Sequence, residues 1–274
     1  MEADQILLGD NLSILPSFPS ERFQLIYLDP PFNTGSKKTR QTIEAKASSK
    51  GDRIGFGGKR YQTTVRSKFS FDDSFDDYLD FLYPRVLEAH RLLSETGTLY
   101  FHIDYRESAY CKILLDEVFG REAFLNEIIW AYDYGGRSKR KWPAKHDNIF
   151  VYVKDPSHYY FSSEDVDREP YMAPGLVTPE KAKKGKLPTD VWWHTIVPTN
   201  GSEKTGYPTQ KPEGIIRRMV VASTKQGDWC LDPFAGSGTL GAVAAKLNRR
   251  FVLIDEKEDA VQIAKDRISE IGRN

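Results

Sequence analysis

The sequence is poor in several features that identify particular classes of protein. Its 274 residues include only two cysteines, Cys111 and Cys230, which are too few for a disulfide framework and lack metal-ligand spacing. No apolar run approaches the roughly 18–20 residues needed to span a bilayer. The first residues also lack the basic stretch and apolar region of a secretory signal. We therefore expect a reducing compartment, two buried free thiols and no membrane partner.

Net charge is also missing, because 39 Lys and Arg balance 39 Asp and Glu. The charge is nevertheless unevenly distributed. Residues 36–70 contain ten basic and two acidic residues, a net charge of +8, and two further basic clusters cover 137–145 and 181–186. Solvated surface loops are one interpretation of these clusters, and a surface for a phosphate backbone is the other. Since 36–70 is also rich in Ser, Thr and Gly, we expect a mobile loop there.

Short apolar runs typical of strands alternate with helical patterns along the chain. Several runs are nearly continuous, as expected for strands buried on both faces of a largely parallel sheet, and the alternation predicts a doubly wound α/β fold. The expected strands cover residues 5–8, 23–28, 98–103, 127–132, 148–153, 228–231 and 251–254. One expected helix is capped by Ser74 and is kinked or restarted at Pro84. Another begins at Pro212, and the remaining expected helices cover 106–119, 239–247 and 257–271. Residues 155–208 fit neither period, so we expect an irregular insertion there.

A glycine-rich turn, DPFAGSGTLG at 232–241, follows the strand expected at 228–231. Gly236 and Gly238 permit a tight turn and close approach of the backbone to a ligand. Asp255, at the end of the next strand, is placed to accept hydrogen bonds from ribose hydroxyls. The pattern predicts a nucleoside site, and a turn that serves only packing is the alternative. Only 19 residues follow Asp255, so earlier strands must complete the sheet, which argues against an ordinary dehydrogenase.

A second turn, Asp29-Pro30-Pro31-Phe32, follows the strand expected at 23–28. The prolines remove two backbone donors and leave carbonyl groups free to accept hydrogen bonds. The Asp29 carboxylate and the Pro30 carbonyl match the two hydrogens of an exocyclic amine, and Phe32 can stack on a planar ring. A proline-terminated strand whose Asp29 caps a turn is the alternative. We expect the five histidines to be structural or surface residues, with no partner for Asp29 among them.

The DPPF segment at 29–32, followed by TQKPEG at 209–214 and DPFAGSGT at 232–239, resembles the DNA amino-methyltransferases of the permuted beta class. The resemblance covers nearly the whole chain and is weakest over 36–70 and 155–190. It implies a Rossmann-like, seven-stranded methyltransferase sheet that is circularly permuted and carries an inserted target-recognition region. It also implies S-adenosylmethionine as the cofactor. No metal is expected, since the sulfonium is already an activated methyl donor.

The resemblance also implies roles for individual residues. The catalytic residues would be Asp29, Pro30, Pro31 and Phe32. The cofactor would be bound by Asp10, Asp29, Thr209, Gln210, Lys211, Asp232, Phe234, Gly236, Ser237, Gly238, Thr239 and Asp255. From the basic clusters, we expect DNA to be contacted by Lys37, Lys38, Arg40, Arg137, Lys139, Arg140 and Lys141.

The implied reaction is site-specific transfer of a methyl group to the N6 amine of an adenine flipped out of duplex DNA. A cytosine-N4 methyltransferase and a non-catalytic DNA-binding relative are the alternatives. We expect residues 1–132 to form the catalytic half, with 36–70 as a lid, and 209–274 to form the cofactor-binding half of the same sheet. Residues 133–208 would be the target-recognition region, with 148–153 a core strand. The expected location is the cytoplasm of a bacterial or archaeal cell, and a homodimer and a cognate restriction endonuclease remain open as partners.

Overall fold

The computed structural model describes residues 3–34, 38–47, 53–54, 60–71, 75, 77–136, 138–198 and 200–272. The chain divides into two compact units, Met1–Phe32 with Asp77–Asn274, and Asn33–Asp76. Both cysteines are buried free thiols, which confirms that prediction. In the described ranges, no helix is long and apolar enough to cross a membrane.

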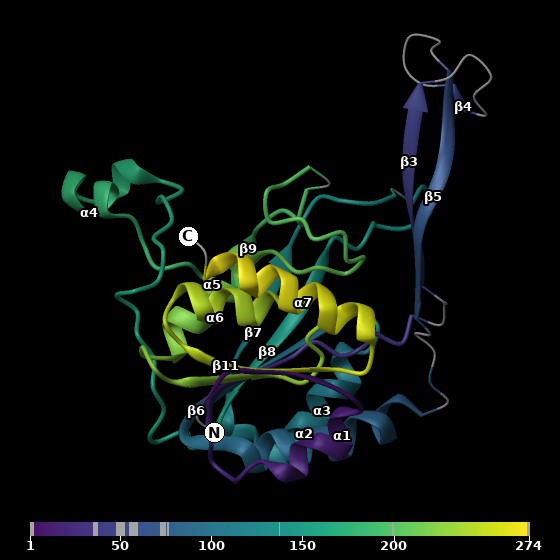
Figure 1. The fold of residues 1–274 in the computed structure, drawn as a ribbon. Helices are drawn as coiled ribbons and strands as arrows, with labels where there is room; N and C mark the ends of the chain where they lie inside the picture. The colour runs from purple at the N-terminus through teal and green to yellow at the C-terminus, as the bar shows by residue number, and fades with distance from the viewer. Residues whose placement is uncertain are drawn as a thin grey trace. The chain divides into compact units, whose positions relative to one another are not determined.

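The larger unit is built on an eight-stranded sheet (Figure 1). Its strands, in spatial order, are β1 (Gln5–Leu8), β11 (Arg250–Asp255), β10 (Trp229–Asp232), β2 (Phe23–Leu28), β6 (Leu93–Asp104), β8 (His146–Val153), β7 (Phe124–Ala131) and β9 (Val191–Trp193). β8 runs antiparallel to β6 and β7, and the other neighbouring pairs are parallel. All seven predicted strands are present. The eighth, β9, is a three-residue edge strand from the segment predicted to be irregular.

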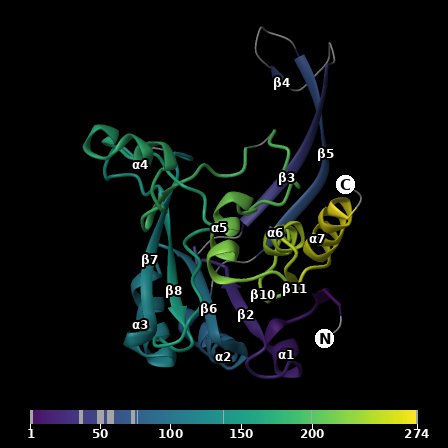
Figure 2. The ribbon, with the colours of Figure 1, turned by 90° about the vertical axis from the view of Figure 1, so that its left-hand side faces the viewer.

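Helices cover both faces of this sheet (Figures 1 and 2). One face carries α1 (Asn11–Ile14), α2 (Tyr78–Leu92) and α3 (Ser108–Phe119), and the other carries α5 (Glu213–Ser223), α6 (Thr239–Lys246) and α7 (Glu258–Ile271). The remaining helical turns are η1 (Leu15–Ser17), η3 (Arg121–Ala123), η4 (Pro174–Leu176) and α4 (Pro179–Lys184). This arrangement confirms the predicted doubly wound α/β fold.

The start of α2 differs from the prediction. Ser74 lies outside the described residues, and the capping residue is Asp77, whose Oδ1 accepts the backbone N–H groups of Leu79 and Asp80 at 3.1 Å. Aspartate caps a helix as well as serine does, so the correct cap could not be chosen by residue type. Pro84 lies inside the helix, which continues through it.

The smaller unit contains a three-stranded antiparallel sheet made of β3 (Lys38–Ala47), β4 (Arg53–Ile54) and β5 (Arg60–Phe71). The prediction of a loop over 36–70 is therefore wrong for these strands. Charge and the weak hydrophobic alternation suggested a loop, but β-branched residues recur at 42–43 and 63–65. Such residues favour an extended backbone even where apolar residues are few.

Gly238 offers a direct test of packing between α6 and α7. Its φ of +70° is left-handed, and a Cβ there would lie 2.7 Å from the Ala264 Cβ. We expect Gly238→Ala to lower the free energy of unfolding by about 2 to 4 kcal/mol, since backbone strain and overpacking add. Urea denaturation measures this loss. Gly175→Ala is the matched control, because nothing lies within 4 Å of its Cβ position. Equal stability of both variants would contradict the prediction.

Candidate active site

Three neighbouring strands bring three carboxylates to one edge of the sheet. Asp29 directly follows β2, Asp232 ends β10, and Asp255 ends β11. β10 pairs in parallel with both β2 and β11, so the carboxyl ends of all three strands meet at that edge. Burial, followed by the charges of Asp29 and Asp255, raises the pKa of Asp232 well above its usual range. We call these three carboxyl groups the acidic edge. A bound cation would favour the ionised form of Asp232, so this edge is complementary to a cationic ligand.

The glycine-rich turn is held tightly to the end of β11. Gly236 has a left-handed φ of +49°, and its N–H donates to Asp255 Oδ2 at 2.8 Å. The Lys257 N–H donates to Asp255 Oδ1 at 3.0 Å. A Cβ at Gly236 would lie 3.0 Å from the Tyr207 Cε1, so the turn packs closely against the Tyr207 ring and has no room for a side chain at this position. Each Asp255 oxygen keeps a lone pair for a hydroxyl donor, which fits a ribose.

The start of the same turn is anchored from the N-terminal segment. Asp232 Oδ1 accepts the Phe234 N–H at 3.0 Å, and the Pro233 carbonyl accepts Asn11 Nδ2 at 2.8 Å. Asp10, the preceding residue, caps α1 and accepts Arg85 Nη2 at 3.0 Å. Asp10 is therefore the neighbour of Asn11, which contacts the turn directly.

The end of the turn is fixed by a buried arginine. Arg267 Nη1 donates to Thr239 Oγ1 at 3.0 Å and lies 3.4 Å from Ser237 Oγ. Its Nη2 donates to Glu213 at 2.9 Å. Ser237 and Thr239 therefore link the turn to α5 and α7.

Residues 209–211 differ in their contacts and in their exposure. Gln210 is buried, and its Oε1 accepts the backbone N–H of Thr205 at 2.9 Å, while its Nε2 donates to the Glu203 carbonyl. These contacts hold the preceding loop together. Thr209 is exposed. Of these three residues, Lys211 is the one that contacts the Asp29 carboxylate.

The Asp29 carboxylate has two cationic or imidazole neighbours. Lys211 Nζ donates to Asp29 Oδ1 at 2.7 Å and lies 4.6 Å from the centroid of the Phe32 ring. His102 Nδ1 lies 3.8 Å from the same Asp29 oxygen, and its ring centroid is 5.6 Å from that of Phe32. The structure thus brings Asp29 and Phe32 together, with the Lys211 ammonium close to both. The Pro31 carbonyl accepts the Tyr78 hydroxyl at 2.5 Å, which fixes the turn.

A buried polar network lies behind Asp29 and was not predicted from the sequence. His102 is fully buried, with Nδ1 2.7 Å from the Tyr27 hydroxyl and Nε2 3.1 Å from Asp147 Oδ2. Tyr132 donates to Asp147 Oδ1 at 3.0 Å. Burial acts to raise the pKa of Asp147, but the hydrogen bond from His102 and neighbouring charges hold it below its usual range. The prediction that no histidine lies near Asp29 is wrong for His102. The available signal was a polar residue inside the otherwise apolar run TLYFHI.

The predicted DNA-contacting residues fall into two groups. Lys139, Arg140 and Lys141 are exposed between β7 and β8, beside Trp142, which is 95% exposed. A cavity of about 280 Å³ at the same edge of the sheet is lined by Lys141 together with Asp147 of the buried network. Lys38 and Arg40 lie on β3, whereas Lys37 and Arg137 lie outside the described residues.

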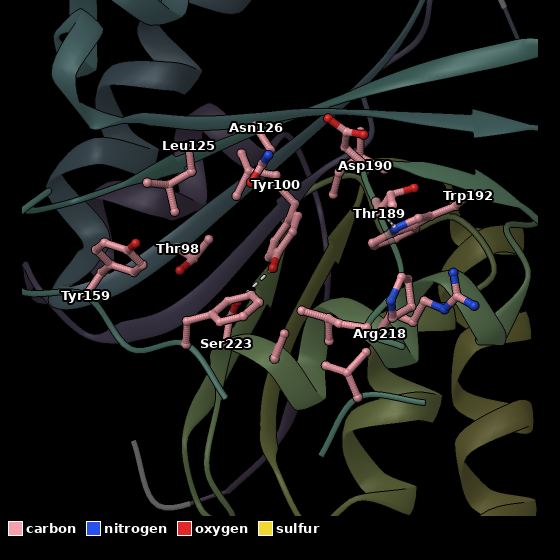
Figure 3. Close-up of a pocket in the computed structure, with 17 residues that line it drawn as sticks. Thr98, Tyr100, Leu125, Asn126, Tyr159, Thr189, Asp190, Trp192, Arg218 and Ser223 are labelled. Carbon is pink, nitrogen blue, oxygen red and sulfur yellow. Dashed lines mark hydrogen bonds between the residues drawn. The ribbon is translucent and has the colours of Figure 1, made fainter. Parts of the chain in front are cut away.

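A separate cavity of about 530 Å³ lies beside Thr98 and Tyr100 of β6 (Figure 3). It is bounded by Tyr100, whose hydroxyl is 2.8 Å from Ser223 Oγ, and by Trp192 and Tyr159 of the 155–208 segment. Burial raises the pKa of Tyr100 to about 12. None of the predicted site residues that the structure describes lines this cavity, so the acidic edge is the better candidate for catalysis.

Comparisons with known proteins identify the family that the chain is similar to. A family model described as DNA methylase matches residues 23–266. The chain is 30% identical over 268 residues to the type II methyltransferase M.HpaI of Haemophilus parainfluenzae, covering 97% of this chain and 74% of that protein. It is 28% identical over 275 residues to the DNA adenine methyltransferase YhdJ of Escherichia coli (strain K12), covering 97% and 83%.

Two solved structures share the fold. The M1.HpyAVI–SAM complex superposes with a TM-score of 0.62 at 20% identity, covering 96% of this chain and 98% of that one. The cytosine-N4-specific PvuII DNA methyltransferase superposes with a TM-score of 0.63 at 15% identity, covering 99% and 94%.

Proposed function

The chain belongs to the DNA methylase family, and from that premise we propose that it transfers a methyl group from S-adenosylmethionine to the N6 amine of adenine in duplex DNA. The observation that carries the proposal is the pairing of β2 with β10. This pairing sets an acceptor for an amine, Asp29, beside a glycine-rich turn suited to a nucleoside. Membership confirms the resemblance to DNA amino-methyltransferases drawn from the DPPF and DPFAGSGT segments, whereas the permuted order stays a prediction.

The acidic edge fits the proposed cofactor. S-adenosylmethionine, when bound, supplies a methyl group on a positively charged sulfonium. A sulfonium at this edge would favour the ionised forms of Asp29, Asp232 and Asp255, and the free lone pairs of Asp255 would accept the ribose hydroxyls. The M1.HpyAVI relative was solved as a SAM complex.

Asp29 and Pro30 would activate the target amine. The lone pair of an adenine amine is delocalised into the ring, so the nitrogen is a poor nucleophile. Hydrogen bonds to the Asp29 carboxylate and the Pro30 carbonyl would localise that lone pair for in-line attack on the methyl group. Methylation would leave a proton to be lost from the amine nitrogen, and Asp29 is placed to accept it.

The target base has to leave the duplex to reach this edge. Unstacking costs a few kcal/mol, and stacking on Phe32 would recover part of it. The DPPF turn favours adenine, and the relative YhdJ is named an adenine methyltransferase. The family's cytosine enzymes more often have Ser in place of Asp, which supports adenine, but the rule has exceptions. Cytosine N4 is therefore the second candidate, and the PvuII neighbour is cytosine-N4-specific.

Methylation-sensitive sequencing of DNA from cells expressing the chain tests the proposal. We expect N6-methyladenine in one sequence context, and its loss with Asp29→Ala. N4-methylcytosine would establish the second candidate instead. Binding of DNA without any methylation would indicate a non-catalytic relative.

Residues 133–208 are proposed as the target-recognition region. The segment holds exposed Lys139, Arg140 and Lys141, and exposed Trp142 and Trp193 offer faces for base contacts. The proposal retains two partners from the resemblance, a second copy of the chain and a cognate restriction endonuclease. Sedimentation of the purified chain tests the first.

Neutralising Lys139, Arg140 and Lys141 to Gln is expected to weaken DNA binding similarly for all sequences. Because each phosphate contact contributes about 0.9 to the slope of log K against log salt, the slope should become shallower by about 2 to 3. Fluorescence anisotropy over a salt series measures it. The control neutralises Arg121, Lys225 and Lys265, which are exposed elsewhere. An unchanged slope in the first variant would remove this segment from the DNA interface.

A further inference from the structure

The ammonium of Lys211 contacts both the Asp29 carboxylate and the Phe32 ring. Its Nζ is 2.7 Å from Asp29 Oδ1 and 4.6 Å from the centroid of the Phe32 ring. The side chains of Lys211 and Asp29 are only 11% and 16% exposed. The pair is therefore a largely desolvated contact of a cation with a carboxylate and an aromatic face.

These are the two groups that the proposed function assigns to the target base. An adenine amine would donate an N–H to Asp29, as the ammonium does, and the ring would cover the face of Phe32, as the cation does. The amine of the base and the Lys211 ammonium cannot both occupy the position at Asp29 Oδ1, whereas a base without that amine leaves the position to the ammonium. We propose that Lys211 is an internal occupant of the base pocket, which leaves Asp29 when the target amine enters. The inference rests on the proposed function.

The surroundings of Lys211 permit this movement. Its backbone is fixed, because its carbonyl accepts Thr239 Oγ1 at 3.2 Å and Pro212 follows at the start of α5. Its four-carbon side chain can pivot on that anchor. The Lys211 charge also acts to lower the pKa of Asp147 and of Asp232, so both carboxyl groups lie within electrostatic range of the ammonium. A lysine that leaves Asp29 therefore stays close to other carboxyl groups.

A binding cycle tests the competition without cofactor. The duplex carries the methylated sequence found by sequencing, with adenine or with purine, which lacks the 6-amine, at the target position. In the wild type, the amine gains a hydrogen bond to Asp29 only by displacing the Lys211 ammonium from it. The duplex with adenine should therefore bind little more tightly than the duplex with purine. In Lys211→Met the amine gains a vacant acceptor, and the adenine preference should rise about tenfold.

Two matched variants complete the cycle. Lys211→Arg keeps a cation beside Asp29 and should retain the wild-type preference. Lys246→Met removes a 2.6 Å ion pair with Glu213 on the surface and should also behave as the wild type. Circular dichroism verifies that each variant is folded.

The outcomes separate the two proposals. An equal or smaller adenine preference in Lys211→Met overturns the competition. A lack of preference in every protein overturns it as well, while the proposed function stands if sequencing has found N6-methyladenine. If sequencing finds no methylated adenine, the proposed function fails by itself.

Discussion

Asp29→Asn is expected to reduce the rate of methyl transfer by about 10²- to 10³-fold at saturating cofactor and DNA, the cost of losing one preorganised electrostatic group. The amide has the shape of the carboxylate, but its oxygen is neutral and its NH₂ group cannot accept a hydrogen bond. It would therefore neither localise the lone pair of the target amine nor accept the proton that the amine loses. The loss should appear in the chemical step.

Single-turnover transfer of a labelled methyl group measures that step directly. Asp259→Asn, an exposed carboxylate in the first turn of α7, is the control and should react at the wild-type rate. Urea denaturation of both variants shows whether the fold is retained. A loss of less than about tenfold in a folded Asp29→Asn enzyme would mean that another group activates the amine.

The two turns of the site could be predicted because each is local. Asp29 and Phe32 follow an apolar strand within four residues, and Gly236 and Gly238 lie between a strand and a helix. Their chemistry depends on conformations that proline and glycine fix by themselves. The sequence therefore predicts what each turn can bind. The pairing of β2 with β10 then places the turns side by side.

The partners of Asp29 could not be predicted in the same way. Lys211 is separated from Asp29 by 182 residues along the chain, and Asp147 is 45 residues from His102. Asp147 faces this site because β8 runs antiparallel to β6, with Asp104 opposite Asp147. Sequence periodicity identifies strands but carries no register between distant ones. A buried histidine in an apolar strand was the one local sign of the network.

The same reasoning explains the error over 36–70. Net charge predicts partners and solubility, but not whether a segment forms strands. The hairpin of β3 and β5 is joined by backbone pairing from Lys38 opposite Phe71 to Ala47 opposite Tyr61. This pairing requires an extended backbone and not a core, so a highly charged segment satisfies it.

Asp255→Ala is expected to weaken cofactor binding by about 10²- to 10⁴-fold. Two hydrogen bonds from hydroxyls to a carboxylate contribute about 1.5–3 kcal/mol each, and 1.4 kcal/mol is a factor of ten. Calorimetry with S-adenosylmethionine and with S-adenosylhomocysteine measures the change. Both ligands carry the same ribose, so both should weaken equally.

The carboxylate of Asp255 also accepts the Gly236 and Lys257 N–H groups, so part of the loss could come from a distorted turn. Two variants separate these contributions. Asp255→Asn keeps one acceptor oxygen and should give an intermediate affinity, whereas exposed Glu256→Gln should bind as the wild type. If Asp255→Ala lowers the urea midpoint while affinity is unchanged, Asp255 supports the turn alone and another group holds the ribose. A fall in affinity at an unchanged midpoint assigns the ribose to Asp255, because only the ligand then loses its acceptor.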